Sequence, residues 1–531
     1  MNSFWLLLFS FIIFILSYRY YGRFLTKQFG VDNNESTPAH TRFDGVDFVP
    51  AKNWTVLFGH HFSSIAGAGP IVGPILAVTW GWLPACIWII FGSIFIGGVH
   101  DFGALMLSLK NKGNSIADIS KDIISKRARI IFMIFVWLAL ALVIAIFAKF
   151  GAITLARQPT IVLPSMGIIP LAVLIGYLMY QKGMNQKFLT LLSCIIVAGL
   201  IIAGKFLPIK LNSILIWMII LFVYSYIASI TPVHILLQPR DYIASFLLVF
   251  GMAFGILGVI ISRPVLSAPA FIGFRSQTEG LLWPMLIVTV ACGAISGFHS
   301  LVSSGTTVKQ ISKQSDACKI GYGGMLLEGG LAIIAVICVA AGLGDKDVVL
   351  KYLSVKTNPI AAFTEGYGNI TQSFLGSYGR IFSATLLNAF ILTTLDTATR
   401  IGRYLTEELF ALKNRYISTA IIVVFSGLLT FSGSGEKIWP VFGASNQLVA
   451  ALALLVISCW LLGMGKKAWF VILPAGFMLC TTIMALIINA LKFMHDGKIM
   501  LVILSLTLVV LALFLIYEAI VGVKKILSLN A

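Results

Sequence analysis

The fold is decided by Gly59-His60-His61-Phe62-Ser63-Ser64-Ile65-Ala66-Gly67-Ala68-Gly69-Pro70-Ile71-Val72-Gly73-Pro74, a polar and glycine-rich stretch inside apolar sequence. Glycine and proline open the hydrogen-bonded ladder of a helix, and the freed N–H and C=O groups cannot face lipid. Such a stretch is tolerated where protein encloses it, as in the broken helices that form the substrate sites of secondary transporters. The sequence therefore predicts a membrane carrier with a broken helix at this point.

The composition places the rest of the chain in a membrane as well. Its 531 residues are 59% hydrophobic and 11% charged, whereas soluble domains carry roughly 25% charged residues. The net charge of +18 does not indicate nucleic-acid binding, because Lys and Arg gather in short loops between apolar runs. These loop charges predict an external N-terminus and a cytoplasmic C-terminus. Segment 1–17 is expected to be a retained first span rather than a cleaved signal.

Apolar runs long enough to cross a bilayer number about 15. The fold class expected from them is an all-α, polytopic helical membrane protein. Residues 346–378 fall in the longest external loop, and no soluble part is large enough to be an enzyme.

A short internal sequence similarity indicates a repeat. The pattern from His61 to Gly67 has a partner from His299 to Gly305, with paired serines inside each. An odd number of membrane crossings separates the two segments, so they run in opposite directions, as in inverted-repeat transporters. On this hypothesis the core is two sets of five spans. The first set runs from 54–79 to 187–205, and the second runs from 283–302 to 439–462.

Both segments supply groups that suit a small anion. Where the helix restarts after Gly67 or Gly305, free N–H groups and the helix dipole would attract an anion. Serine and threonine hydroxyls add donors, and the histidines add a proton or a charge, although each could instead be a packing residue. The candidate substrate-binding residues are His61, Ser63, Ser64, Gly67, Gly69, His299, Ser303, Ser304, Gly305 and Thr306.

Ionisable residues inside spans are candidates for coupling, because they are costly in lipid. The candidates for ion or proton coupling are Asp396, Thr393, Thr394, Asp101 and Glu328. Asp396 could carry a proton, and the two threonines could hold sodium. The alternative for Asp396 is an ion pair with Arg400 or Arg403 at helical spacing. Arg240-Asp241 is expected to anchor a loop.

No cofactor and no metal site is predicted. His60, His61, His100 and Asp101 could supply ligands, but adjacent histidines on a helix point in different directions. The seven cysteines show no ligand spacing and are expected to be small core residues.

Several long motifs carry a resemblance to a known family. They are Leu57-Phe58-Gly59-His60-His61-Phe62, Leu237-Gln238-Pro239-Arg240-Asp241-Tyr242, Ala291-Cys292-Gly293-Ala294-Ile295-Ser296-Gly297-Phe298-His299, Thr393-Thr394-Leu395-Asp396-Thr397-Ala398-Thr399-Arg400 and Phe442-Gly443-Ala444-Ser445-Asn446-Gln447. With these motifs the chain resembles the carbon starvation protein A family of bacterial inner-membrane carriers.

The resemblance implies the leucine-transporter-like, five-plus-five inverted repeat of the amino acid–polyamine–cation superfamily. It also implies an N-terminal transport module at 1–345 and a five-span C-terminal module at 379–531. In such carriers a coupling cation sits between the first and eighth core helices, here the segment near Gly67 and the Thr393-Thr394 segment. Characterised relatives are associated with proton-coupled pyruvate uptake and with peptide use during carbon starvation.

The leading hypothesis is therefore a secondary active transporter for proton-coupled uptake of pyruvate or a similar small monocarboxylate. A peptide or amino acid carrier is the alternative, and it needs a larger cavity and a partner for an ammonium group. A nutrient-sensing membrane protein is a weaker alternative, since no output domain is visible. The expected partners are the small-molecule substrate, a proton or sodium ion, and the lipid bilayer.

Overall fold

The segment around Gly67 forms a broken helix in the computed structural model, which describes residues 2–345, 348–349, 351, 359–431 and 439–530. Helix α3 (Trp54–Ile65) is capped by Asn53, whose side chain accepts a hydrogen bond from the Val56 N–H at 3.0 Å. Helix α4 (Gly69–Ala77) follows after a break, and the two halves are bent by 46°. The predicted break is confirmed.

The described part of the chain holds eleven helices that are long and apolar enough to span a membrane, and the bent pair α3/α4 makes a twelfth. Two shorter apolar helices, α11 (Ile214–Ile230) and α20 (Arg415–Phe431), lie among them. The all-α membrane class is confirmed, whereas the count of about 15 spans stays a prediction.

The second broken segment lies earlier in the chain than predicted. Helix α13 (Leu282–Thr289) ends before the stretch 290–296, and α14 (Gly297–Gly305) begins after it. The expected restart after Gly305 is therefore wrong. His61 precedes the first break, whereas His299 follows the second break. The two similar sequence stretches therefore do not occupy equivalent positions in the two repeats. The first residues after each break, Gly69 and Gly297, do match, and α4 and α14 are both nine residues long.

The lengths of the helices identify the two repeats. After each broken pair come a spanning helix, a 32-residue helix, a 17-residue helix and a helix of 25 or 26 residues. In the first repeat these are α5/α6 (Trp82–Gly92 and Gly98–Lys110), α8 (Lys126–Arg157), α11 and α12 (Leu237–Ser262). In the second they are α15 (Gly323–Ala340), α19 (Tyr378–Leu409), α20 and α21 (Trp439–Gly463).

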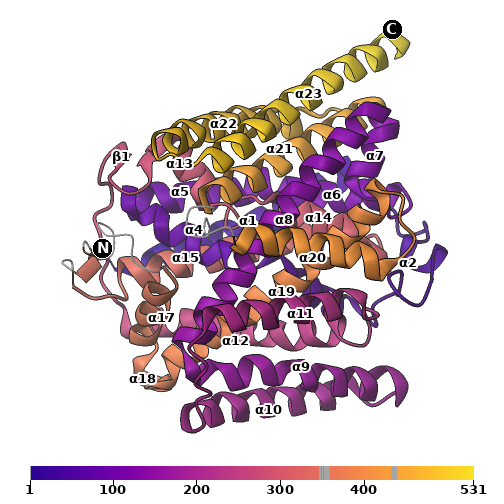
Figure 1. Ribbon diagram of the computed structural model, residues 1–531. Coiled ribbons are helices and arrows are strands. Elements are labelled where there is room, and N and C mark those ends of the chain that lie inside the picture. Colours follow the sequence, from indigo (N-terminus) through magenta and orange to yellow (C-terminus); the bar gives the residue numbers. More distant parts are fainter. Residues whose placement is uncertain (1, 346–347, 350, 352–358, 432–438, 531) are drawn as a thin grey trace.

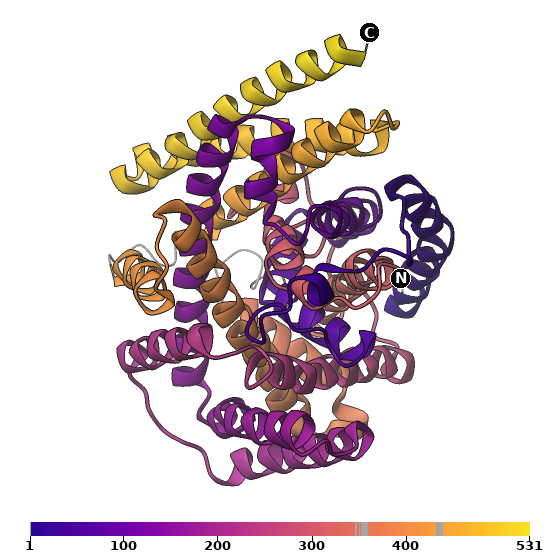
Figure 2. The same cartoon turned by 90° about the vertical axis from the view of Figure 1, so that its right-hand side faces the viewer.

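The sequence assigned spans 161–180 and 187–205 to the first repeat, and this assignment is wrong. Those spans form α9 (Val162–Gly176) and α10 (Gln186–Phe206), a hairpin at the lower edge of the molecule in Figure 1. Helices α22 (Trp469–His495) and α23 (Ile499–Asn530) cover the opposite edge, and α1 (Ser3–Phe29) lies against one side (Figure 2). Hydropathy could not separate these peripheral helices from core helices, because their values overlap: the mean hydropathy is 2.2 over α10 and 2.1 over the span that contains α15.

Short elements connect the spanning helices. They are α2 (Pro38–Thr41), α7 (Ile116–Ile123), α17 (Pro359–Ile370), α18 (Gln372–Leu375), the 3-10 turns Val78–Trp80, Pro159–Ile161 and Thr307–Lys309, the π turns Ser93–Gly97, Tyr177–Gln181 and Cys318–Tyr322, and the antiparallel strands β1 (Arg275–Ser276) and β2 (Gly280–Leu281). Helices α17 and α18 occupy much of the segment expected to be an external loop at 346–378.

Each break is stabilised by side chains from another helix. The α19 hydroxyls of Thr393 and Thr394 donate to the carbonyl oxygens of Ser63 and Ser64, at 2.6 and 3.1 Å. On α21, Gln447 donates to the carbonyl oxygen of Ile287 at 2.7 Å. Its neighbour Asn446 accepts from the Phe298 N–H at 2.8 Å, so both breaks have partners for freed backbone groups.

The close packing of the two broken segments gives a first test. A Cβ added at Gly73 of α4 would lie 2.3 Å from the carbonyl oxygen of Thr289, which is backbone and cannot rotate away. We expect Gly73→Ala to lower the free energy of unfolding by about 1–3 kcal/mol, measured by thermal unfolding in detergent. Gly199→Ala on the exposed face of α10 is the matched control, because nothing lies within 4 Å of its added Cβ. Equal stability of the two variants would contradict this packing.

Candidate functional site

A buried ion-pair network lies beside the first break. Arg240 on α12 pairs with Asp396 on α19, with Nη2 of Arg240 donating to Oδ1 of Asp396 at 2.9 Å. The same guanidinium donates to Oδ1 of the neighbouring Asp241 at 2.5 Å. Tyr224 on α11 donates to the second carboxylate oxygen of Asp396 at 3.0 Å. Arg240 is 2% exposed, and both carboxylates are fully buried.

The network continues onto the broken helix α3. The Nδ1 atom of His60 lies 2.6 Å from Oδ2 of Asp241. The Ser63 hydroxyl donates to the Asp241 carbonyl oxygen at 2.9 Å, and the Ser64 hydroxyl lies 3.2 Å from that of Thr397. Elements α3, α11, α12 and α19 therefore meet at one buried polar cluster at the end of α3.

Two expectations for these charged residues are wrong. Asp396 pairs with Arg240 and not with Arg400 or Arg403. These two arginines instead form ion pairs with Asp47, with N–O distances of 3.2 and 3.3 Å. Arg240-Asp241 does not anchor a loop, because α12 begins at Leu237 and carries both residues into the protein interior. The long loop 42–53, which holds Asp47, supplies the nearer partner for the two arginines at the end of α19.

A second buried cluster lies at the second break. Nδ1 of His299 on α14 lies 2.8 Å from Oδ2 of Asp101 on α6, and Nδ1 of His100 lies 2.7 Å from Oδ1 of the same carboxylate. Nε2 of His299 lies 3.2 Å from Oε2 of Glu328 on α15. Among the described residues, neither Nε2 of His299 nor either oxygen of Glu328 forms a hydrogen bond.

Most of the predicted site residues fall into three groups. The first break and its network bring together Ser63, Ser64, Gly67, Thr393, Thr394 and Asp396. The second cluster contains His299, Asp101 and Glu328, and Gly69 packs against Cys292 there. Ser304 and Gly305 line the pocket described below.

The other three predicted residues, His61, Ser303 and Thr306, belong to none of these groups. His61 is buried, with Nδ1 2.8 Å from the Thr307 hydroxyl. Thr306 donates to the Val302 carbonyl oxygen within its own segment at 3.0 Å. The Ser303 hydroxyl is buried and has no hydrogen-bond partner among the described residues.

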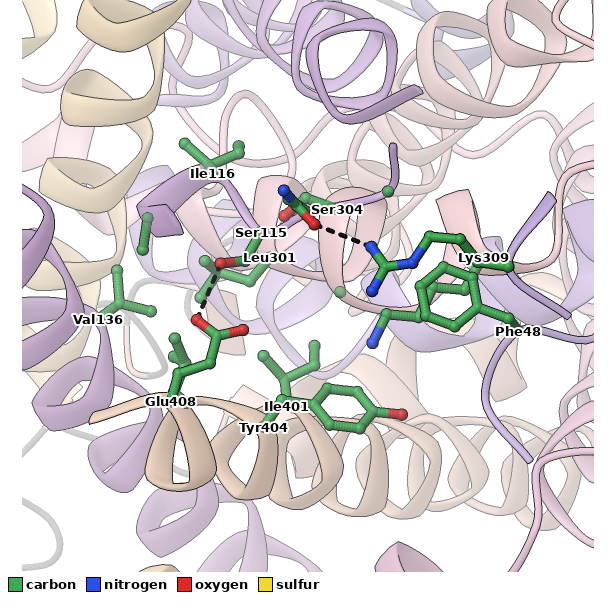
Figure 3. A pocket seen from close by; sticks show the side chains of 16 residues that line it. Phe48, Ser115, Ile116, Val136, Leu301, Ser304, Lys309, Ile401, Tyr404 and Glu408 are labelled. Carbon is green, nitrogen blue, oxygen red and sulfur yellow. Dashed lines mark hydrogen bonds between the residues drawn. The ribbon is translucent and has the colours of Figure 1, made fainter. Parts of the chain in front are cut away.

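A pocket of about 100 Å³ lies at the end of α14. It is walled by α14, α7, the last turns of α19 and the loop 42–53. Lys309 and Glu408 reach into it from opposite sides, with Tyr404 between them (Figure 3). Nζ of Lys309 lies 3.7 Å from the centre of the Tyr404 ring, whereas Glu408 accepts from Ser115 at 3.4 Å. The pocket therefore offers a cation and an anion on facing walls.

Burial lowers the pKa of Lys309 to about 8, although the nearby carboxylates of Asp47 and Glu408 oppose this shift. Burial raises the pKa of Asp47, but the charges of Arg403, Lys309 and Arg400 outweigh it and hold that pKa below its usual value. Lys309 forms no ion pair within 4 Å in the part of the chain that the structure describes, so its ammonium group is available to an anion.

Sequence reasoning missed several residues of these clusters. Arg240 and Asp241 were placed just outside a span, yet an ionisable pair beside an apolar run is a candidate by the same rule that selected Asp396. Tyr224 gave no signal, because tyrosines are common near the ends of spans. Lys309 gave none either, since its packing against Phe48 and Tyr404 comes from segments far apart in the sequence.

Comparison with known proteins identifies the family to which the chain belongs. The family model for the carbon starvation protein CstA matches residues 2–345 and 343–485. The chain belongs to the carbon starvation protein CstA family. The peptide transporter CstA of Escherichia coli (strain K12) is 30% identical over 91% of this chain and 80% of its own length. The pyruvate/proton symporter BtsT of the same strain is 30% identical over 91% of this chain and 81% of its own length.

Solved structures confirm the inverted-repeat fold. The manganese transporter of Eremococcus coleocola, in complex with an aromatic bis-isothiourea substituted compound, matches with a TM-score of 0.53 at 12% identity, covering 91% of this chain and 99% of its own. MhsT in complex with L-phenylalanine matches with a TM-score of 0.52 at 15% identity, covering 88% and 99%. The expected leucine-transporter-like core is confirmed, and membership of a family of carriers agrees with the expectation that the chain is not an enzyme.

The bond between α19 and the first break gives a second test. Thr393→Val removes the hydroxyl that donates to the Ser63 carbonyl oxygen and leaves that oxygen buried without this partner. We expect a loss of about 1–3 kcal/mol of stability, measured by thermal unfolding. Thr399→Val is the control, because Thr399 is equally buried on α19 but donates only to Leu395 of its own helix. An equal effect of the two changes would show that the link to α3 contributes nothing particular.

Proposed function

We propose that this chain is a secondary active transporter that couples proton entry to uptake of pyruvate or a similar small monocarboxylate during carbon limitation. The observation that carries this proposal is the buried Arg240 held between two carboxylates beside the first break. A buried arginine is the residue best suited to bind a carboxylate, through paired N–H donors.

The charges of this network suggest how proton and substrate are coupled. Arg240 bears one positive charge, whereas Asp241 and Asp396 together bear two negative charges when ionised. A proton on Asp396 removes one negative charge and releases the guanidinium N–H groups that this carboxylate now accepts. A substrate carboxylate can then pair with Arg240 in its place. The net charge of the occupied site equals that of the empty one, so neither proton nor anion enters the interior alone.

The pocket at the end of α14 is proposed as part of the substrate path on the cytoplasmic side. Its volume of about 100 Å³ corresponds to about three water molecules at liquid density, which favours a small acid over a peptide. Lys309 would bind the carboxylate there, and the Ser304 side chain lies in the same wall. With an external N-terminus, loop 42–53 follows the first predicted span and Lys309 follows the ninth, 283–302, so both would lie on the cytoplasmic side.

A peptide or amino acid is the second candidate substrate. Glu408 faces Lys309 across the pocket, and this pair could hold the ammonium and carboxylate ends of a zwitterion (Figure 3). Relatives named as peptide transporters support the same alternative.

The membrane arrangement is proposed from the loop charges: a multi-pass protein of the bacterial inner membrane with an external N-terminus and a cytoplasmic C-terminus. The two segments matched by the family model meet at residues 343–345. This junction supports the proposed boundary between the N-terminal transport module, 1–345, and the C-terminal five-span module, 379–531.

The coupling role of Asp396 is tested by uptake of labelled pyruvate into proteoliposomes, with an inward proton gradient and without sodium. We expect the wild type to accumulate pyruvate, and we expect this accumulation to stop when a protonophore is added. Asp396→Asn should abolish accumulation but retain exchange of pyruvate across the membrane, because the amide cannot release a proton and no longer neutralises Arg240.

The control is Asp118→Asn, which removes a carboxylate paired with Arg129 at 2.7 Å in the connection between spans. It should accumulate pyruvate normally. Full accumulation by Asp396→Asn would remove Asp396 from the mechanism. Accumulation that requires sodium would instead favour the oxygen atoms around Thr393 and Thr394 as the coupling site. Uptake of dipeptides but not of pyruvate would favour the second candidate.

The pocket is tested through the pH dependence of pyruvate binding from the side predicted to be cytoplasmic. Lysine attracts an anion only in its ammonium form, and the pKa of Lys309 is lowered to about 8. Binding should therefore be strong below pH 8 and weaken as the pH rises through that value. Lys309→Gln should weaken binding at pH 7 about tenfold or more, which is 1.4 kcal/mol, and should remove the pH dependence. Lys313→Gln is the control, because Lys313 is exposed and does not line the pocket. An unchanged pH profile in Lys309→Gln would exclude the role of Lys309.

A further inference from the structure

The cluster at the second break contains two carboxylates but no permanent cation among the described residues. It contains the carboxylates of Asp101 and Glu328 and the imidazoles of His100 and His299, all fully buried. No Lys or Arg among the described residues forms an ion pair with either carboxylate. The network around Arg240, in contrast, has its own permanent cation. Buried carboxylates cost several kcal/mol unless a positive charge offsets them, and here that charge can come only from a protonated imidazole or from a bound cation.

The side chains converge in the way that metal ligands do. One ligand atom from each of Cys292, His299 and Glu328 lies within 4.8 Å of the others. Nε2 of His299 and Oε2 of Glu328 are only 3.2 Å apart, yet they form no hydrogen bond. Metal–ligand bonds of about 2.0–2.3 Å at tetrahedral angles place ligand atoms roughly 3.3–3.8 Å apart. A small contraction of the cluster would therefore suffice.

The surroundings of the three residues match the outer shell of a metal site. Asp101 holds Nδ1 of His299 at 2.8 Å, which directs the Nε2 lone pair toward Glu328. A carboxylate behind a ligating histidine fixes its tautomer and orientation in many zinc proteins. Near Cys292, the amide nitrogen of Asn446 lies 3.9 Å from Sγ and can stabilise a thiolate.

We propose that Cys292, His299 and Glu328 form a binding site for a zinc ion at the second break. Thiolate, imidazole and carboxylate are the three ligand types that zinc takes in proteins, and three protein ligands leave a fourth tetrahedral position open. The ligands come from the stretch 290–296, from α14 and from α15, so the ion joins the broken helix to the next spanning helix. This site departs from the expectation that the cysteines are only small core residues.

Zinc content tests the proposal directly and does not depend on any transport activity. The full chain is purified in detergent without a polyhistidine tag, treated with a chelator, reloaded with zinc chloride, freed of excess metal and analysed by mass spectrometry. We expect about one zinc ion per wild-type chain. Glu328→Gln and Cys292→Ser should each lower the bound zinc about tenfold or more. Cys338→Ser, at a buried free cysteine on α15, is the matched control and should retain the metal.

Cobalt substitution separates loss of a ligand from loss of folding. A thiolate bound to Co²⁺ gives a charge-transfer band that the wild type and Cys338→Ser should show and Cys292→Ser should lack, while all three elute as single species on size exclusion. Wild-type protein that binds no zinc after loading would overturn the proposal. Equal zinc in the wild type, Glu328→Gln and Cys292→Ser would overturn it as well.

Discussion

The structure depends on how the backbone groups freed at the two breaks are satisfied. Within a bilayer an unpaired carbonyl or N–H group costs several kcal/mol, so a broken helix exists only with partners from other helices. Thr393 and Thr394 meet this need at the first break, and Asn446 and Gln447 meet it at the second. The long helices α19 and α21 are thereby fixed against the broken ones, and the charged clusters form where these helices meet.

The negative charges of the carboxylates are compensated differently in the two buried clusters. At the first break, Arg240 is a permanent cation between Asp241 and Asp396, and its guanidinium satisfies both carboxylates. At the second, Asp101 is satisfied by two imidazoles, whereas both oxygens of Glu328 form no hydrogen bond with the described residues. The first cluster is suited to exchanging one anion for another, and the second to accepting a cation.

Features set by local chemistry could be predicted from the sequence, whereas features set by packing between distant segments could not. The glycines and prolines near Gly67 located the first break, because their effect on the backbone is local. The sequence similarity around His299 predicted a second break but placed it at the wrong residues, since a similar run of serines and glycine can lie on either side of a break. Spans 161–180 and 187–205 were assigned to the core because hydropathy does not record which helices are neighbours. Arg240 was assigned to a loop for a related reason: the beginning of α12 was placed five residues too late, at Tyr242 and not at Leu237.

In the proposed transport cycle, the ion pair between Arg240 and Asp396 also has a mechanical role. Arg240 stands on α12, the last helix of the first repeat, whereas Asp396 stands on α19, the third helix of the second. Helix α3 is tied to both, through the contact of His60 with Asp241 and through the hydroxyls of Thr393 and Thr394. Protonation of Asp396 weakens the link between α12 and α19 while the bonds from α19 to α3 remain. A substrate carboxylate then takes the place of Asp396 on the arginine. Proton and substrate together thus break this link without leaving the buried Arg240 unpaired, and that joint requirement is the condition for symport.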